Sequence, residues 1–253
     1  MLLIDTHAHL NMSEFASDLT DVLKRATEAG VETVINVGFD RKSSQETIEL
    51  ADKNPNIFAV IGFHPHEAKG ISEDDYSWLK SALSHPKVLA LGEIGLDYHY
   101  DNSPRDLQRS VFVRQLEMAR ELGKKIVVHS REAALETREI LFEHDGPTLL
   151  HCFSGSAEMA EEYLKKGYYL ALGGAVTFKN ARKPLEVLQR IGAEHLLLET
   201  DSPYMTPVPF RGKRNEPALL TLILKRVAEI LSMPADQLAD KTTGNARHFF
   251  EMD

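Results

Sequence analysis

Two histidines stand two positions apart near the start of the chain, in the stretch LLIDTHAHLN at positions 2–11. In an extended segment, the side chains of residues i and i+2 point to the same side. His7 and His9 can therefore direct both imidazoles at one point in space, as a metal ion requires. A histidine pair of this kind also arises by chance, so its interpretation depends on what else the chain brings to the same place.

Histidines and carboxylates also follow several other short apolar runs. They occur in the stretches GFHPH, LGEIGLDY, VVHSRE, LLHCFSG and LLLETDSPY, and they are His64, His66, Glu93, Asp97, His129, His151, Glu199 and Asp201. Neutral imidazoles together with carboxylates suit zinc, manganese and other divalent ions. The set exceeds what one tetrahedral zinc needs, and a carboxylate can bridge two metals, so we expect two divalent ions, Zn²⁺, Mn²⁺ or Mg²⁺. Glu199 lies deeper than Asp201 and is expected in the core or behind a ligand.

Other catalytic chemistries lack their motifs. No G-x-S-x-G stretch follows an apolar run, and neither phosphate-binding glycine pattern, G-x-x-x-x-G-K-[ST] or G-x-G-x-x-G, is present. Cys152 is the only cysteine, which excludes an intramolecular disulfide. Because Cys152 directly follows His151 in an extended run, we expect it to point away from the candidate site and to be a small buried residue.

A cluster of cations in the stretch RGKRN follows the last apolar run. Loops at that place in barrels often bind phosphate. Arg211, Lys213 and Arg214 are therefore candidates for holding a phosphodiester backbone, although a solvated loop explains them equally well. Tyr204 and Phe153 lie close to candidate ligands in the sequence, and each either stacks on bases or packs in the core.

The elements that must position these residues follow one another with a regular rhythm. Eight apolar or β-branched runs occur at positions 2–5, 31–38, 56–64, 88–93, 125–129, 148–152, 168–174 and 195–201. Segments with the i, i+3, i+4, i+7 spacing of an amphipathic helix separate most of them. Several of these segments end in a glycine that fits a helix C-cap, namely Gly30, Gly123, Gly167 and Gly192.

Continuous apolar strands that alternate with helices indicate a parallel sheet covered by helices. Eight repeats in 253 residues give about 32 residues each, the size of one βα unit. We therefore predict an α/β fold, a single-domain (β/α)8 TIM barrel over residues 1–253, with a C-terminal helical extension from about Ala218. In the tail SMPADQLADKTTGNARHFF we expect two short helices, with Pro234 near one start and Thr242 or Thr243 as a cap. In such a barrel the active site lies at the C-terminal strand ends, where the candidate ligands fall.

Composition narrows the class of protein. Apolar residues make up 43% of the chain, enough for a sizeable core, and the net charge of −9 excludes a generally basic nucleic-acid coat protein. No stretch approaches the roughly 20 apolar residues of a membrane span. The first apolar run, residues 1–4, is too short for a signal peptide. We expect a cytoplasmic protein with no membrane partner, and a monomer is favoured.

Six stretches together resemble the successive motifs of the TatD-type deoxyribonuclease family, metal-dependent hydrolases of the amidohydrolase superfamily. They are LLIDTHAHLN, GFHPH, LGEIGLDY, VVHSREA, LLHCFSG and LLLETDSPYMTPVPFRGKRNEP, and they cover essentially the whole chain. The resemblance implies a TIM-barrel hydrolase with two metals that acts on DNA ends. The metal ligands that it implies, with Glu93 as the bridging carboxylate, are His7, His9, Glu93, His129, His151 and Asp201. The residues that it places near substrate are His64, Arg131, Arg211 and Lys213.

We therefore expect hydrolysis of phosphodiester bonds in DNA, by a 3′–5′ exonuclease that acts on single strands. Asp201 is expected to accept a proton from the metal-activated water, and His64 to bind phosphate or assist the leaving group. Two alternatives stay open. The same centre could attack a carbonyl, in an amidase, a lactonase or an aminoacyl-tRNA deacylase, because the fold does not choose the substrate. A non-catalytic binding barrel with structural metals is less favoured, since the full ligand set is present.

Overall fold

A computed structural model describes residues 2–252, in which strands and helices alternate along the chain. The strands are β1 (Leu3–Ala8), β2 (Val31–Val37), β3 (Ile57–Ile61), β4 (Val88–Asp97), β5 (Lys125–Arg131), β6 (Thr148–Leu150), β7 (Tyr169–Leu172) and β8 (Leu196–Leu198). They belong to one sheet in the order β1 to β8, and the strand pairs described are parallel. Each of the eight apolar runs overlaps one of these strands. The predicted (β/α)8 barrel class is confirmed.

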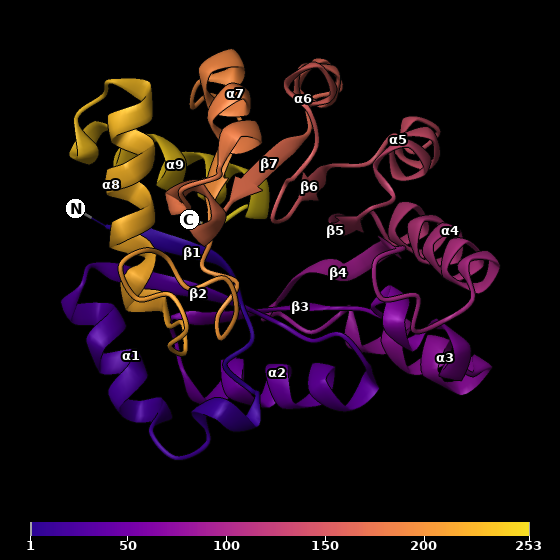
Figure 1. The fold of residues 1–253 in the computed structure, drawn as a ribbon. Helices are drawn as coiled ribbons and strands as arrows, with labels where there is room; N and C mark the ends of the chain where they lie inside the picture. The colour runs from indigo at the N-terminus through magenta and orange to yellow at the C-terminus, as the bar shows by residue number, and fades with distance from the viewer. Residues whose placement is uncertain (1, 253) are drawn as a thin grey trace. The chain divides into compact units, whose positions relative to one another are not determined.

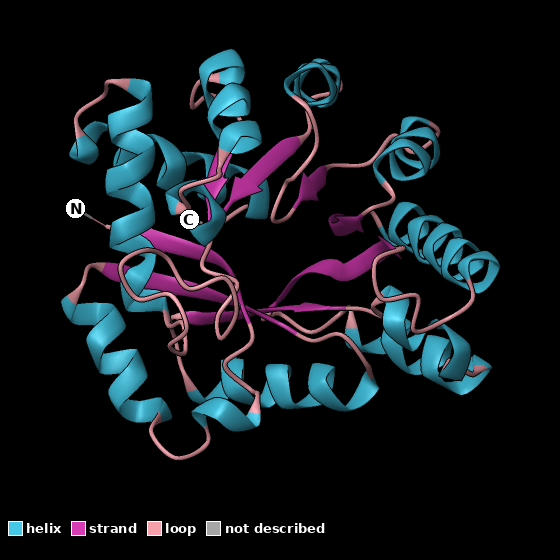
Figure 2. Cartoon of the chain, viewed as in Figure 1, coloured by secondary structure: helices cyan, strands magenta, loops and turns pink. Residues whose placement is uncertain are grey.

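Helices follow the strands in the predicted alternation (Figures 1 and 2). The α-helices are α1 (Leu19–Glu28), α2 (Arg41–Lys53), α3 (Glu73–Ala82), α4 (Arg105–Leu122), α5 (Ala134–Phe142), α6 (Ala157–Lys165), α7 (Arg182–Ile191), α8 (Leu220–Leu231) and α9 (Ala235–Phe250). Short 3₁₀ helices are η1 (Ser13–Phe15), η2 (Pro65–Gly70), η3 (Gly174–Thr177) and η4 (Pro217–Leu219). None of the helices in residues 2–252 is long and apolar enough to span a membrane.

Contacts divide the chain into two compact units, and one of them is built from both ends of the sequence. This first unit comprises residues up to 36 together with those from 151 onward. Within it β1 pairs with β2 and β7 pairs with β8. An isolated parallel bridge between Ala8 and Ser202 joins the end of β1 to the segment after β8. Residues near the two ends of the chain are therefore neighbours within this unit.

The second unit is continuous and comprises residues 37–150. Strands β3, β4, β5 and β6 pair in sequence order, all parallel. Helices α2, α4 and α5 pack against β3, β4 and β5. Strand β4 is longer than the predicted run at 88–93, because its last residues continue to pair with β5, from Gly95 opposite His129 to Asp97 opposite Arg131. The single-domain assignment over residues 1–253 stays a prediction.

The tail differs from the prediction of two short helices, which is wrong. One helix, α9, runs from Ala235 to Phe250, and Pro234 precedes it as expected. Thr242 does not cap a helix; its hydroxyl donates to the Leu238 carbonyl one turn earlier. The hydroxyl of Thr243 donates to the carbonyl of Leu2. Both threonines are buried and have their hydroxyls bound by carbonyl groups, one within α9 and one in a distant segment, so they lie inside a helix rather than at its start.

Candidate metal centre

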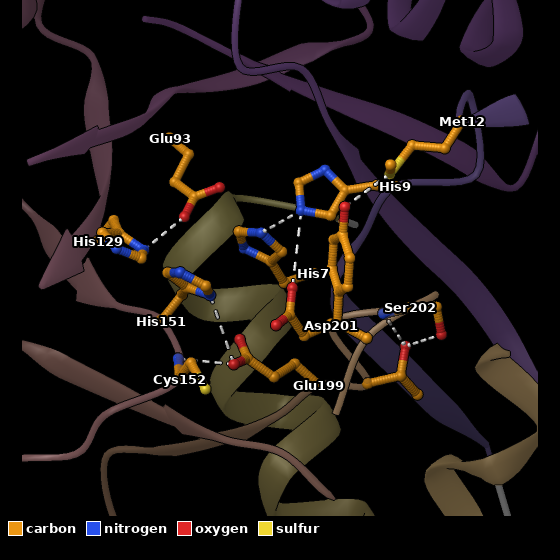
Figure 3. A network of polar contacts seen from close by, with 12 residues as sticks. His7, His9, Met12, Glu93, His129, His151, Cys152, Glu199, Asp201 and Ser202 are labelled. Carbon is orange, nitrogen blue, oxygen red and sulfur yellow. Dashed lines mark hydrogen bonds and ion pairs between the residues drawn. The ribbon is translucent and has the colours of Figure 1, made fainter. Parts of the chain in front are cut away.

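The first unit gathers a group of imidazole and carboxylate side chains that we call the His7 cluster, consisting of His7, His9, His151, Glu199 and Asp201 (Figure 3). Nε2 of His7 lies 3.3 Å from Nε2 of His9. The ring of His151 stacks on the ring of His7 at a centroid distance of 3.9 Å. Nε2 of His9 lies 3.6 Å from Oδ1 of Asp201. The spacing of two residues at the end of β1 thus brings two imidazoles together, as expected.

Backbone contacts within the first unit hold the segment after β8 against β1. The N–H of Asp201 donates to the carbonyl of His7, and the N–H of His9 donates to the carbonyl of Ser202. Asp201 adopts a positive φ of 57°, a conformation that few residues other than glycine take. The chain turns at this position, and Figure 3 shows the carboxylate directed at His9.

Two buried carboxylates lie behind the ligands of the His7 cluster. Oε1 of Glu199 accepts a hydrogen bond from the backbone N–H of Cys152 and lies 3.5 Å from Nδ1 of His151. Oε2 of Glu199 is buried and has no hydrogen-bond partner among residues 2–252. Asp5 accepts hydrogen bonds from the N–H and the hydroxyl of Thr200. Both carboxylates therefore support the cluster from the core side, as expected for Glu199.

Burial and hydrogen bonds act in opposite directions on the acids of the first unit. Burial raises the pKa of Asp5 to about 7, against the hydrogen bonds from Thr200 and from the His7 backbone, which lower it. Burial also acts to raise the pKa of Asp201, but the hydrogen bond from His9 and the nearby His151 outweigh it, so that this pKa lies below its usual value. The Asp201 carboxylate is thus held in its charged form, the form that binds cations.

The second unit gathers a group that we call the His129 cluster, consisting of His64, His66, Glu93, Asp97 and His129. Oε1 of Glu93 lies 2.9 Å from Nδ1 of His129 and 3.6 Å from Nε2 of His64. Figure 3 shows the contact between Glu93 and His129. Glu93 lies within β4 and His129 within β5, which are paired. The parallel register therefore places these two ligands side by side.

Within this cluster, the Asp97 side chain lies behind His129 and makes four polar contacts. Its Oδ2 lies 3.1 Å from Nε2 of His129 and 3.1 Å from Nε2 of His66. Its Oδ1 accepts hydrogen bonds of 3.0 Å from the backbone N–H groups of His99 and Tyr100. Burial acts to raise the pKa of Asp97, but the hydrogen bonds from His129 and Tyr100 outweigh it and hold that pKa well below its usual range.

His64 lies next to Glu93, and its expected role near substrate stays a prediction. Its side chain is buried, and burial lowers its pKa well below the usual value, which keeps the imidazole neutral. A neutral imidazole is the form that binds a metal. One ligand atom each of His64, Glu93 and His129 lies within 4.8 Å of the others, so His64 is a possible ligand in addition to the six that the resemblance implies.

Both clusters suit divalent ions. In each, a set of three side chains from the cluster offers ligand atoms within 4.8 Å of one another; the sets are His7, His9 and Asp201, and His64, Glu93 and His129. Imidazole nitrogen and carboxylate oxygen are ligands for zinc, manganese and related ions. Carboxylates behind ligand histidines, as Asp97 is behind His129, are typical of metal sites. The bridging role of Glu93 stays a prediction.

The residues expected near substrate in the first unit belong to the loop after β8. Tyr204 is 50% exposed, and its ring lies 6.2 Å from the ring of His9. The guanidinium of Arg211 lies over the ring of Phe178 at 3.9 Å, and the ammonium of Lys213 lies 5.6 Å from the ring of Phe210. Both cations are exposed, and neither pairs with a carboxylate among the described residues. The loop thus presents cations and aromatic rings to solvent.

Three further residues considered in the sequence, Cys152, Phe153 and Arg214, are not placed to bind substrate. Arg214, the third cation of the stretch RGKRN, pairs with Asp18 and is not available as a free cation. Phe153 is buried and packs near Tyr163. Of its two expected roles, stacking on bases or packing in the core, the structure therefore favours packing. Cys152 does not continue a strand as expected, because β6 ends at Leu150; it is half-buried with a φ of 43°.

In the second unit, Arg131 is exposed at the end of β5, with its guanidinium 4.8 Å from the ring centroid of Tyr100. Its expected place near substrate is compatible with this exposure. Tyr100 had no expected role, although it stands only three residues after Asp97 in the sequence.

Known proteins resemble the chain over nearly its whole length. A family model described as TatD related DNase matches residues 4–251. The chain is 44% identical to YabD of Bacillus subtilis, named an uncharacterized metal-dependent hydrolase, over 99% of this chain and 100% of that protein. The crystal structure of YjjV, a TatD homolog from Escherichia coli K12, matches with a TM-score of 0.94 and 30% identity, over 99% of this chain and 98% of that one.

Proposed function

The chain belongs to the TatD-related family of metal-dependent hydrolases, as its motifs indicated, and we propose that it cleaves phosphodiester bonds of DNA. We propose further that it acts as a 3′–5′ exonuclease on single strands. A cytoplasmic location and a monomeric state are part of this proposal. The family match supports hydrolysis, whereas the choice of DNA depends on the surroundings of the clusters.

One observation carries the choice of substrate: Tyr204 stands exposed next to His9, in the same loop as the exposed cations Arg211 and Lys213. An exposed aromatic ring can stack on an unpaired base, and cations can bind the phosphates that flank it. A protein of net charge −9 would otherwise repel a polyanion, so a local cationic loop is needed.

The protein's own groups would divide the work as follows. Divalent ions, when bound, lower the pKa of a water and neutralise charge on the phosphoryl oxygens. Asp201 has two carboxylate oxygens, so one can hold a ligand position while the other accepts the proton of the attacking water. Glu93 and His129 hold their ligand positions from paired strands. Arg211 and Lys213 would keep the strand in place through its phosphates.

The test is nucleotide release from single-stranded DNA labelled at its 3′ or 5′ end. The protein is first stripped of metal, and Mg²⁺, Mn²⁺ or Zn²⁺ is then added back. His129→Ala is compared with His85→Ala, which changes a histidine outside both clusters. We expect metal-dependent release from the wild type and from His85→Ala, and none from His129→Ala. The label that is released first reports the direction of cleavage.

The main alternative, attack on a carbonyl, is tested in parallel with esters, lactones and aminoacyl-tRNA. If folded protein releases no nucleotide with any metal but hydrolyses one of these carbonyl compounds, the proposal for DNA is wrong and the carbonyl alternative replaces it. If RNA is cleaved and DNA is not, the proposed phosphodiester hydrolysis is retained, but the proposal that the substrate is DNA is wrong.

A further inference from the structure

Tyr100 is an exposed aromatic side chain in the segment that follows β4, and none of the roles above uses it. Its side chain is 55% exposed, although a tyrosine normally buries most of its ring. It belongs to the second unit, in which the His129 cluster also lies. Tyrosine is enriched at binding interfaces, because its ring is apolar and its hydroxyl is polar.

The ring is held in place despite its exposure. The backbone N–H of Tyr100 donates to Oδ1 of Asp97 at 3.0 Å. The ring meets the ring of His66 nearly perpendicularly, with centroids 5.5 Å apart, and that of His99 in the same way at 4.7 Å. A ring that is already fixed loses little conformational freedom when a ligand stacks on it. The surface is therefore preorganised.

The same carboxylate connects this ring to the His129 cluster. Oδ1 of Asp97 holds the backbone of Tyr100, and Oδ2 of Asp97 contacts Nε2 of His129. The ring and the ligand are thus fixed relative to each other through one buried side chain. A molecule that stacks on Tyr100 would consequently be held at a set position with respect to His129.

Arg131 adds a positive charge at this place. Its guanidinium lies 4.8 Å from the centre of the Tyr100 ring, and no carboxylate among residues 2–252 pairs with it. The adjacent Glu132 contacts Nδ1 of His99 at 2.7 Å instead. By contrast Arg105, which also lies over a tyrosine ring, is bound by Asp101. The charge of Arg131 therefore remains available for an anionic ligand.

We propose that Tyr100 and Arg131 form a subsite for one nucleotide of a single strand. The unpaired base stacks against the tyrosine ring, and the guanidinium binds an adjacent phosphate. Bases inside a duplex already stack on their neighbours, so this subsite selects single strands and frayed ends. The inference rests on the proposed action on DNA, and it assigns a role to Tyr100 that neither the sequence motifs nor the family match supplies.

The test compares two single-stranded oligonucleotides that have the same sugar-phosphate backbone. One carries thymine throughout, and the other has abasic tetrahydrofuran residues at its last three positions. We expect the wild type to prefer the thymine strand in kcat/KM, and Tyr100→Ala to reduce this preference about 10-fold, within the range for stacking of one base on an aromatic ring. Tyr100→Phe, which keeps the ring, should restore the preference.

Phe58→Ala is the matched control, because Phe58 also lies under a cation, Lys87, but near the start of β3. It should prefer the thymine strand as the wild type does. The subsite is refuted if Tyr100→Ala discriminates between the two strands as the wild type does, or if Phe58→Ala loses the preference equally.

A second measurement separates this inference from the proposed function. Binding of the same two oligonucleotides, labelled with fluorescein, is followed by fluorescence anisotropy and does not depend on cleavage. If the wild type cleaves neither strand but binds the thymine strand more tightly in a way that requires Tyr100, the subsite stands and the proposed hydrolysis is wrong. If it cleaves DNA and neither measurement depends on Tyr100, the hydrolysis stands and the subsite is wrong.

Discussion

Replacing Asp97 by asparagine tests whether Asp97 keeps His129 in the tautomer whose Nδ1 is free of hydrogen and can bind a metal. The change keeps the size of the side chain but converts one carboxylate oxygen into an amide NH₂ group. Oδ1 of Asp97 accepts from two backbone N–H groups at 3.0 Å, so in the variant the amide oxygen has to remain on that side. The NH₂ group would then face Nε2 of His129, 3.1 Å away in the wild type.

This arrangement favours the wrong tautomer of His129. An NH₂ group donates, so Nε2 has to accept, and the ring hydrogen moves to Nδ1. Nδ1 is the atom that lies 2.9 Å from Oε1 of Glu93, where the ligand set is formed. A protonated ring nitrogen cannot bind a metal, so binding would require the ring to return to a tautomer in which two donors face each other.

The expected loss of metal-binding free energy in Asp97→Asn equals the contribution of the hydrogen bond between Asp97 and His129. A hydrogen bond to a charged group contributes about 1.5–3 kcal/mol. Since about 1.4 kcal/mol corresponds to a factor of ten, the metal affinity should fall about 10- to 150-fold. This range agrees with the loss of about 10- to 100-fold that is typical when the partner of a ligand histidine is changed.

The assay is competition for Zn²⁺ or Mn²⁺ between the protein and a chromophoric chelator, which needs no turnover. Asp101→Asn is the control, because Asp101 is an exposed carboxylate that pairs with Arg105. Urea titration of each variant shows that it is folded. A folded Asp97→Asn protein that binds metal as tightly as the wild type would refute the reasoning, as would an equal loss in Asp101→Asn.

Three further outcomes are expected. Replacing Arg211 and Lys213 together by alanine should weaken binding to single-stranded DNA and reduce the steepness of log K against log salt concentration by about 1.4, since each phosphate contact contributes about 0.7. As the control, replacing the two exposed lysines of α2, Lys42 and Lys53, should leave this slope unchanged. Gly95→Ala should lower the free energy of unfolding by about 2 kcal/mol or more in a urea titration, because φ is +142° and a Cβ would come 2.0 Å from a carbonyl oxygen of β5; equal urea midpoints would contradict this. Hydrogen bonding to Arg214 lowers the pKa of Asp18 from 3.8 to about 2, so the stability that their pairing contributes should be full above pH 3.8 and vanish as the pH falls through about 2. Asp18→Asn should remove that pH dependence, and an acid-unfolding curve equal to that of the wild type would exclude this contribution of the pair.

The strands and most helix ends could be predicted from the sequence because each has a local cause. Strands of a parallel sheet are buried on both faces, so they appear as continuous apolar runs. The four glycines expected as helix C-caps, Gly30, Gly123, Gly167 and Gly192, all have positive φ. These features depend on a few neighbouring residues, which a single sequence displays directly.

Features that depend on tertiary contacts were not accessible in this way. The sequence shows that His64 follows a strand, but its grouping with Glu93 and His129 depends on side-chain directions. The tail gave a wrong result because buried contacts, such as that of Thr243 with Leu2, outweigh local preference. Tyr100 lies two residues beyond the end of the stretch LGEIGLDY, and its position just after a strand end is the only signal of its role in the sequence.

The chain order of the two clusters has a consequence for synthesis. The His129 cluster draws its members from positions 64 to 129, whereas the His7 cluster joins residues that are up to 194 positions apart, His7 to Asp201. Contacts between distant residues form only after both have left the ribosome, and domains emerge from their N-terminal end. A chain that stops before position 200 can therefore make only one of the two ligand groups. We expect hydrolytic activity to arise only in chains that have been synthesised beyond Asp201, so that shorter products are inactive.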